Sequence, residues 1–406
     1  MTRLLATAAC GLLAGAAQAQ EAEVMHWWTS GSEAAALQVF TGAFEAAGGT
    51  WIDNAVPDFE SAIAAATSSI IGGNPPDALQ FNAGTQFADL AQLGYLGDLS
   101  GYAEAGNWQK ALPPALYDAV SYDGKVYAMP VDNHGENWLW VNRKAMADAG
   151  VALPESWEGF FPMLDKLKAA GVIPVAHGGE AWQELELFYQ IMMFRGDDAL
   201  YRAIVVDGDT SALETPEFAA FAGDFRKLTD YVDAGAPGRK WNDATQMVIS
   251  GQAAMQFMGD WAKGEFVAAG LVPGEDYDCV LGFGGEDRFV ISADVFVLPE
   301  AAEDAAARDL LVATMMSPET QVAFNELKGG LPARLDADVS GMDACAQKGY
   351  AAMQTPEFQV PGPEISASAD RVGAIQDAVT QYWNTPSETP ADFAAALRDA
   401  LEMTAE

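Results

Sequence analysis

Residues 25–37, MHWWTSGSEAAAL, place two adjacent tryptophans between an apolar run and a stretch rich in alanine that favours a helix. Successive side chains of a strand point to opposite faces, so one indole can enter a core while its neighbour faces outward. Ser30 or Ser32 can then cap a helix over residues 30–49. This stretch predicts a strand that ends at the mouth of a binding cleft and leads directly into a helix.

Strands and helices alternate beyond this point. The sequence predicts extended segments at 22–28, 50–58 and 77–81, with helices at 30–49 and 87–100 between and after them. Such alternation is typical of an α/β domain with a largely parallel sheet. Ligands of open α/β sheets gather where strands end and loops turn into helices.

Several unusual side chains fall at predicted strand-to-helix turns that are far apart in the sequence. They are Trp27, Trp28, Asn82, Trp182 and Asp294. A binding site assembled from distant loops explains these positions better than scattered core aromatics would.

The length of the chain predicts two domains. The sequence has 406 residues, of which 50% are hydrophobic and 10% aromatic. This is more than one hydrophobic core usually accommodates. Because no low-complexity linker or repeat interrupts the chain, we expect short crossovers to join the two domains.

Residues 1–19 have the composition of a secretory signal peptide. Arg3 precedes a short apolar run, and Ala17-Gln18-Ala19 forms a site of small residues for cleavage after Ala19. Cys10 leaves a lipoprotein open as an alternative, but Thr7 stands where a lipobox normally has leucine. The apolar run is too short to span a bilayer. We therefore expect an exported, periplasmic protein.

The charge of the chain excludes two classes of partner. Fifty-eight acidic residues against 21 basic ones give a formal net charge of −37. Such a surface repels nucleic acid and anionic lipid, so we expect neither as a partner.

Two cysteines remain after removal of the expected signal peptide. In an oxidising compartment Cys279 and Cys345 most simply form one disulfide, although two unpaired buried thiols stay an alternative. Neither has a partner at metal-ligand spacing, and the chain has only three histidines. We expect no metal site and no cofactor.

Six segments of this sequence resemble the extracellular solute-binding proteins of sugar-importing ABC transporters, family 1, and are closest to its glucose/mannose-binding branch. In order, the segments are VMHWWTSGSEAAAL, GNPPDALQF, DGKVYAMPVDNHGENWLWVN, HGGEAWQ, GQAAMQFMGDWAKGEF and FNELKGGLPAR. The resemblance implies a two-lobed α/β periplasmic-binding-protein fold of type II, the Venus-flytrap architecture, in which hinge crossovers join the lobes.

By this analogy the lobes divide at the hinge. The first lobe takes residues 20–131 plus 289–337, and the second takes 132–288 plus 338–406. The crossovers fall near Pro130 and Ser292, with a third after Arg334. The disulfide is expected within the second lobe. A permease in the inner membrane is the implied partner, and the protein is expected to be a monomer.

The resemblance also implies the ligand-binding residues. The expected aromatic platforms are Trp27, Trp28, Trp182 and Trp261, and the expected polar partners are Glu33, Asn82, Gln183, Asp294, Lys328 and Asp370. We expect Trp28 rather than Trp27 to face the ligand and to form the central pair with Trp261. Glu33 has a second interpretation as a charge at a helix N-terminus, and Lys328 as part of a helix end.

These residue types suit a sugar. Flat rings cover the C–H face of a pyranose, while carboxylates, amides and ammonium groups bind its hydroxyls. The sequence departs from the glucose binders at two places, and both departures argue against glucose as the ligand. Asn82 replaces an expected lysine, and residues 368–371 read SADR where a histidine is expected.

Two other functions stay open. A polyol or a glycosylated osmolyte would suit the same side chains. An exported glycoside hydrolase could use Glu33 and Asp294 as acid and nucleophile, which requires carboxyls about 5–5.5 Å apart in a retaining enzyme.

Overall fold

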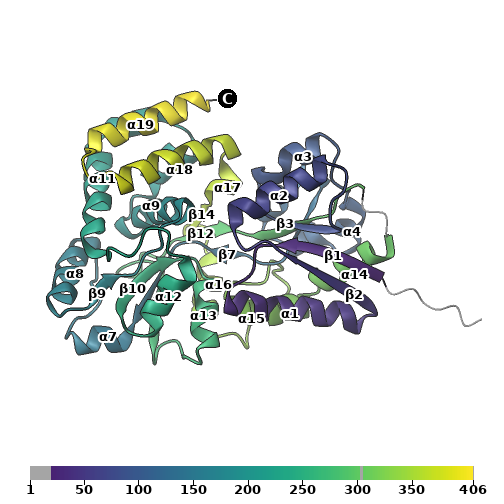
Figure 1. Ribbon diagram of the computed structural model, residues 1–406, viewed down its shortest axis with the longest axis horizontal. Helices are drawn as coiled ribbons and strands as arrows, with labels where there is room; N and C mark the ends of the chain where they lie inside the picture. Colours follow the sequence, from purple (N-terminus) through teal and green to yellow (C-terminus); the bar gives the residue numbers. More distant parts are fainter. Residues whose placement is uncertain (1–19, 302–304, 406) are drawn as a thin grey trace, which may run out of the picture.

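The computed structural model describes residues 20–301 and 305–405, and the expected signal peptide, residues 1–19, lies outside them. The polypeptide forms two lobes, each built around its own β-sheet (Figure 1). The first strand ends at His26, two residues earlier than the sequence predicts. Trp27 and Trp28 therefore lie in the loop that leads into the first helix.

The sheet of the first lobe has five strands in the order β2-β1-β3-β13-β6. β1 runs parallel to β2 and β3, whereas β13 runs antiparallel to β3 and β6. The pairing sets Asn82, at the end of β3, opposite Asp294, at the start of β13. The strands are β1 (Gln20–His26), β2 (Gly49–Ala55), β3 (Ala78–Asn82), β6 (Ala128–Pro130) and β13 (Asp294–Val297).

Helices cover both faces of this sheet, with α2 on one side and α1 and α15 on the other (Figure 1). Ser30, one of the two serines that the sequence offers as caps, caps α1, since its hydroxyl accepts from the backbone N–H of Glu33. The helices are α1 (Gly31–Ala46), α2 (Phe59–Ile71), η1 (Thr85–Phe87), α3 (Ala88–Gln92), α4 (Ser100–Ala105), α5 (Trp108–Ala111), α6 (Pro114–Ala119), α14 (Ala305–Met315) and α15 (Pro318–Lys328). A small hairpin of β4 (Ser121–Tyr122) and β5 (Lys125–Val126) lies beside them.

The sheet of the second lobe has four strands in the order β11-β8-β10-β9. These are β8 (Trp138–Asn142), β9 (Ile173–Val175), β10 (Ala253–Met258) and β11 (Tyr277–Val280). The helices after β8 are α7 (Arg143–Asp148), η2 (Trp157–Gly159), α8 (Phe160–Ala169), α9 (Ala181–Arg195), α10 (Asp198–Tyr201), η3 (Arg202–Val206), η4 (Thr210–Glu214), α11 (Pro216–Leu228), η5 (Thr229–Tyr231), α12 (Trp241–Ile249) and α13 (Ala262–Ala268). Four more follow near the C-terminus: α16 (Ala344–Met353), α17 (Pro363–Ser366), α18 (Ala369–Asn384) and α19 (Pro390–Met403).

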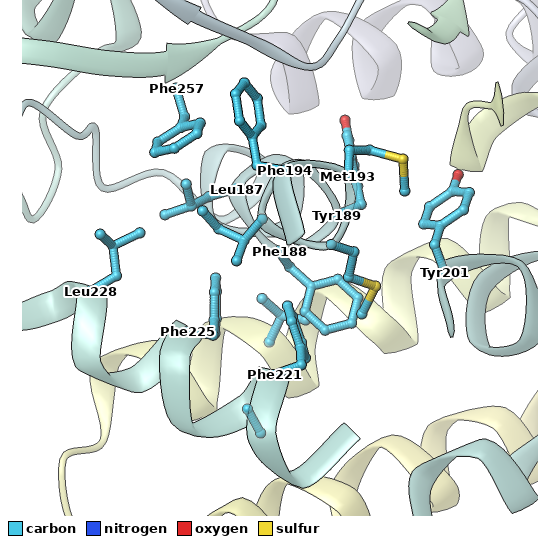
Figure 2. Packing of buried hydrophobic residues seen from close by; sticks show 14 of the residues in the cluster. Leu187, Phe188, Tyr189, Met193, Phe194, Tyr201, Phe221, Phe225, Leu228 and Phe257 are labelled. Carbon is cyan, nitrogen blue, oxygen red and sulfur yellow. The ribbon is translucent and has the colours of Figure 1, made fainter. Parts of the chain in front are cut away.

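Helix α9 forms the centre of the second lobe. It is buried from Gln183 to Phe194, as expected for a helix that is packed on all sides. Figure 2 shows Phe188 of α9 facing Phe221 and Phe225 of α11, with ring centroids 5.2 and 6.0 Å away. This packing fixes α9, and with it the side chains that α9 presents to the space between the lobes.

A third sheet, in the order β14-β12-β7, lies between the two main sheets (Figure 1). Its strands are β7 (His134–Gly135), β12 (Phe289–Ser292) and β14 (Gln359–Pro361). The extended run 288–299 divides at Ala293 because β12 and β13 belong to different sheets. The chain also changes sheets between β6 and β7. The exact lobe boundaries stay a prediction.

The predicted disulfide is present. Cys279 of β11 and Cys345 of α16 are bonded at 2.05 Å, and the bond joins segments 66 residues apart. Across the described ranges, every helix is too short or too polar to cross a membrane.

Candidate ligand-binding site

A cavity of about 280 Å³ lies between the lobes and is lined by side chains from both. Small-molecule sites usually begin at about 300 Å³, so this cavity is close to the lower end of that class. Seven of the ten predicted residues line it: Trp27, Glu33, Asn82, Trp182, Trp261, Asp294 and Lys328.

Indole rings form much of the cavity wall. Trp27 of the first lobe packs edge-on against Phe59, with centroids 5.1 Å apart. The ring centroids of Trp182 and Trp261 in the second lobe lie 6.3 Å apart. Trp241, which the sequence analysis did not single out, also lines the cavity. Flat apolar surfaces therefore face the cavity from both lobes.

The prediction that Trp28 faces the ligand is wrong. Its side chain is 1% exposed and packs in the first-lobe core against Phe296 and Phe324, at 5.6 and 5.0 Å. Trp27 is the neighbour that lines the cavity. The sequence correctly separates the two rings onto opposite sides, but assigns the sides the wrong way round. Trp27, not Trp28, lines the cavity together with Trp261.

Gln183 and Asp370 lie outside the cavity. Gln183 donates to a carboxylate oxygen of Glu180 at 2.8 Å and is buried within its own lobe. Adjacent helical residues point about 100° apart, so Trp182 takes the position toward the cavity instead. Asp370 is exposed in the first turn of α18, whereas Val372 and Gln376 of the same helix line the cavity.

Glu33 combines its two interpretations. Its Oε2 accepts from the backbone N–H of Ser30 at 3.2 Å, which completes a capping box at the start of α1. The same carboxylate lines the cavity. Burial raises the pKa of Glu33, and the nearby Lys328 ammonium opposes that rise.

Lys328 ends α15 and is the electrostatic centre of the first-lobe wall. Its Nζ lies 3.2 Å from Asp294 Oδ2 and 3.9 Å from Asp132 Oδ2. It also lies 5.6 Å from the ring centroid of Trp28 and 5.8 Å from that of Trp261. Burial would lower the pKa of Lys328, but the carboxylates around it outweigh burial and raise it. Lys328 thus carries a permanent positive charge beneath the cavity.

The pKa values of the ionisable groups around Lys328 shift in different directions. Burial works to raise the pKa of Asp294, but the Lys328 ammonium and a hydrogen bond from Gln80 Nε2 at 2.7 Å hold it below its usual range. Burial and the charge of Asp294 raise the pKa of Asp132. Burial lowers the pKa of His134 to about 4, so this imidazole is neutral near pH 7.

Among the described residues, Asp132, His134 and Asp294 have the spacing of a metal site, with ligand atoms within 4.8 Å of one another. Lys328 Nζ already contacts both carboxylates. The ammonium group supplies the positive charge that a metal ion would otherwise bring.

Five acidic residues of the cavity wall were missed by the sequence analysis: Asp58, Glu136, Glu180, Glu186 and Glu364. A signal for one of them existed. Trp182, Glu186 and Tyr189 recur at the i, i+4, i+7 spacing of one helix face, and all three line the cavity. Glu136 lies within the quoted segment DGKVYAMPVDNHGENWLWVN, but its spacing carries no comparable signal.

The arrangement has close counterparts among known proteins. A probable sugar-binding periplasmic protein of Rhizobium meliloti is 40% identical over 409 residues, which cover 97% of this chain and 98% of that protein. A protein of the same description from Brucella melitensis is 37% identical over 396 residues, covering 94% and 93%. A solved chitin oligosaccharide binding protein superposes with a TM-score of 0.78 at 18% identity, over 95% of this chain and 99% of that one.

The profile of the bacterial extracellular solute-binding proteins matches residues 28–322. This match covers most of the described chain, and it includes most of the elements that line the cavity. Together with the two relatives above, it establishes the family. The chain belongs to the bacterial extracellular solute-binding proteins, whose two-lobed fold it shares.

Proposed function

We propose that the protein captures a mono- or small oligosaccharide between its lobes and delivers it to the permease of an ABC import system. One observation carries the proposal: indole faces and polar side chains from both lobes surround one cavity. The names of its relatives, probable sugar-binding periplasmic proteins, support the same class of ligand.

The cavity provides both kinds of contact that a sugar needs. Trp27 and Trp261 offer flat surfaces to C–H groups, at about 1 kcal/mol for each ring beyond its buried area. Asn82 and Glu33 offer amide and carboxylate groups to hydroxyls, and Lys328 is a donor. A site that pairs each hydroxyl rejects an epimer that leaves a buried group unpaired. Glucose itself stays in question, because Asn82 departs from the glucose-binding pattern.

Lobe closure is the proposed mechanism. A ligand in the cavity touches both lobes, so the closed state gains contacts that an open state lacks, and the population shifts toward closure. The crossovers at Ala293 and between β6 and β7 are the segments about which the lobes would rotate. The closed form is then the one that the permease would recognise.

The same proposal places the mature protein in the periplasm as a monomer, exported by the signal peptide expected at residues 1–19. Mass spectrometry of protein recovered from the periplasm should give a chain that begins at Gln20. A mass that includes a lipid on Cys10 would show the lipoprotein alternative instead.

A titration of tryptophan emission tests the ligand class. Mono- and disaccharides, polyols and glycosylated osmolytes are added to folded protein, with calorimetry as the second readout. We expect saturable binding of at least one sugar. Binding of polyols alone would favour the alternative ligand class. If no compound in the panel changes the emission or releases heat on binding, the proposal is overturned.

The hydrolase alternative is tested with aryl glycosides. Asp294 pairs with Lys328 and accepts from Gln80, and Glu33 completes the capping box of α1, so both carboxylates already have structural roles. We expect no release of the aryl group. Turnover that is lost in Glu33→Gln would contradict a purely binding function.

A further inference from the structure

The second-lobe wall of the cavity carries four glutamates. Glu180 already accepts from Gln183 at 2.8 Å, and the other three come from separate elements. Glu136 follows β7, Glu186 lies on α9, and Glu364 lies on α17, and all three line the cavity. Glu136 and Glu186 are only 4% and 3% exposed. We call Glu136, Glu186 and Glu364 the acidic wall.

The protein satisfies the acidic wall only in part. Tyr189 donates its hydroxyl to Glu136 Oε2 at 2.9 Å, and Gln190 donates to Glu186 Oε1 at 2.9 Å. Glu186 Oε2 and Glu364 Oε2 are buried without a hydrogen-bond partner. An unpaired buried carboxylate oxygen is costly, so these two atoms indicate a missing donor.

The acidic wall also lacks a positive charge. Within residues 20–301 and 305–405, no lysine or arginine forms an ion pair with any of the three glutamates. Two lysines line the cavity: Lys328 is paired with Asp294 and Asp132, and Lys240 donates to the backbone oxygen of Pro57 at 3.4 Å. Burial raises the pKa of Glu136 and Glu186 well above the usual range, and the neighbouring carboxyls raise them further. A cation in the cavity would relieve both effects.

We propose that the ligand is a sugar that carries an ammonium group, and that the acidic wall binds this group. This inference rests on the proposed sugar-binding function. The ammonium group would donate to Glu186 Oε2 and Glu364 Oε2, the two oxygens of the acidic wall that are buried without a hydrogen-bond partner. The ring of the sugar would lie against the indoles, and its hydroxyls would face Asn82 and Glu33.

A bare metal ion fits the acidic wall less well. The described residues contain one set of three groups whose ligand atoms lie within 4.8 Å of one another, and it is Asp132, His134 and Asp294. The three glutamates therefore do not converge on a point, as a metal ion would need. A cavity of about 280 Å³ lined by indoles also exceeds the size of an ion.

The first experiment compares matched sugars by calorimetry at pH 7. The probes are glucose, galactose and mannose, their 2-amino and 6-amino derivatives, and the N-acetyl forms of the 2-amino sugars. We expect at least one amino sugar to bind about tenfold more tightly than its neutral parent, because charge-assisted hydrogen bonds are roughly twice as strong as neutral ones. N-acetylation removes the charge and should abolish the gain.

The second experiment locates the preference. Glu186→Gln should reduce the ratio of amino-sugar to neutral-sugar affinity by about tenfold. The matched control is Glu184→Gln, a buried glutamate of the same helix that accepts from Asn384 and does not line the cavity. In that variant the ratio should stay as in the wild type.

The outcomes separate this proposal from the proposed function. Neutral or N-acetyl sugars that bind as tightly as the amino sugars would overturn the ammonium proposal and leave sugar binding intact. An amine preference that persists in Glu186→Gln would overturn the role of the acidic wall. If no sugar in this panel or in the wider titration binds, the proposed function fails with it.

Discussion

Buried carboxylates lie beside a cation of the protein on one wall of the cavity but not on the other. On the first-lobe wall, Lys328 lies within 4 Å of Asp294 and Asp132, and Gln80 donates to Asp294. On the second-lobe wall, two oxygens of Glu186 and Glu364 have no partner within the described chain. The first wall has an internal cation beside its carboxylates, whereas the second has carboxylate oxygens that a donor in the cavity would satisfy.

This difference separates stability from recognition. A wall whose charges are paired internally holds its side chains in place before the ligand arrives, which reduces the cost of ordering them on binding. A wall with unpaired groups is destabilising until it is filled, and it favours the ligand that satisfies it. We therefore expect mutations on the first wall to affect folding and mutations on the second to affect ligand choice.

Removal of Lys328 should have the largest effect on the first wall. Lys328→Met leaves Asp294 and Asp132 buried without their cation, which should reduce the free energy of unfolding by about 3–5 kcal/mol. Urea unfolding followed by circular dichroism measures the loss. Lys263→Met is the control, because buried Lys263 contacts Asp343, whose side chain is 26% exposed. Equal losses in the two variants would contradict the central role of Lys328.

The two adjacent tryptophans should respond differently. Trp28→Ala removes a ring that is fully packed in the first-lobe core and should reduce the free energy of unfolding by about 3–5 kcal/mol. Trp27→Ala removes a ring that faces the cavity, so we expect a smaller loss of stability and a larger loss of sugar affinity. Urea unfolding and calorimetric titration of both variants make the test. The assignment of the rings fails if Trp28→Ala is the more stable variant.

The predictions from sequence agree best with the structure for features that depend on neighbouring residues or on residue type alone. Ser30 caps α1, and Cys279 bonds to Cys345, as predicted. The cap depends on residues three positions apart, and the disulfide was the simplest pairing of two cysteines. The cavity residues Trp27, Asn82 and Asp294 were found because they stand where strands begin or end.

Other features depend on distances that the sequence does not contain. Which of Trp27 and Trp28 is buried depends on how the loop after His26 meets Phe324 of a helix nearly 300 residues later. Glu136 and Glu364 are more than 200 residues apart, and the third sheet, in which β12 joins β7 to the β14 strand that precedes α17, brings them to one wall. The side of a helix that faces a second lobe is likewise a property of the assembled fold.

Stability should depend on pH through Asp260, a buried carboxylate beside β7 that accepts from the backbone N–H of Gly135 at 2.6 Å. Burial raises its pKa to about 7. Between pH 4 and 7 the folded protein therefore holds a proton that the unfolded chain lacks, and this group makes stability fall as pH rises, by about 1.4 kcal/mol per pH unit.

Asp260→Asn removes this titration and retains an oxygen that accepts from Gly135. From pH 5 to 7, the unfolding free energy of the variant should rise relative to that of the wild type, at the slope given above. Urea unfolding at half-unit pH intervals measures the difference. Buried His134 has the opposite effect, because its pKa of about 4 makes stability fall as the pH drops below 6.5. His134 is present in both the wild type and the variant, so its contribution does not affect the difference between them. Parallel curves for the two proteins would show that Asp260 does not titrate in this range.

The smallest expected effect lies at a contact that joins the two lobes away from the cavity. Ser32, at the start of α1, donates its backbone N–H and its hydroxyl to Glu265 Oε1 of α13, at 3.1 and 2.8 Å. Because this contact exists only when the lobes meet, Ser32→Ala should weaken sugar affinity by about 1 kcal/mol, or about fivefold, mainly through faster dissociation. Ser69→Ala is the control, since Ser69 donates only to Ala66 of its own helix. Stopped-flow dissociation rates that are equal in both variants would show that the Ser32–Glu265 contact does not hold the lobes together.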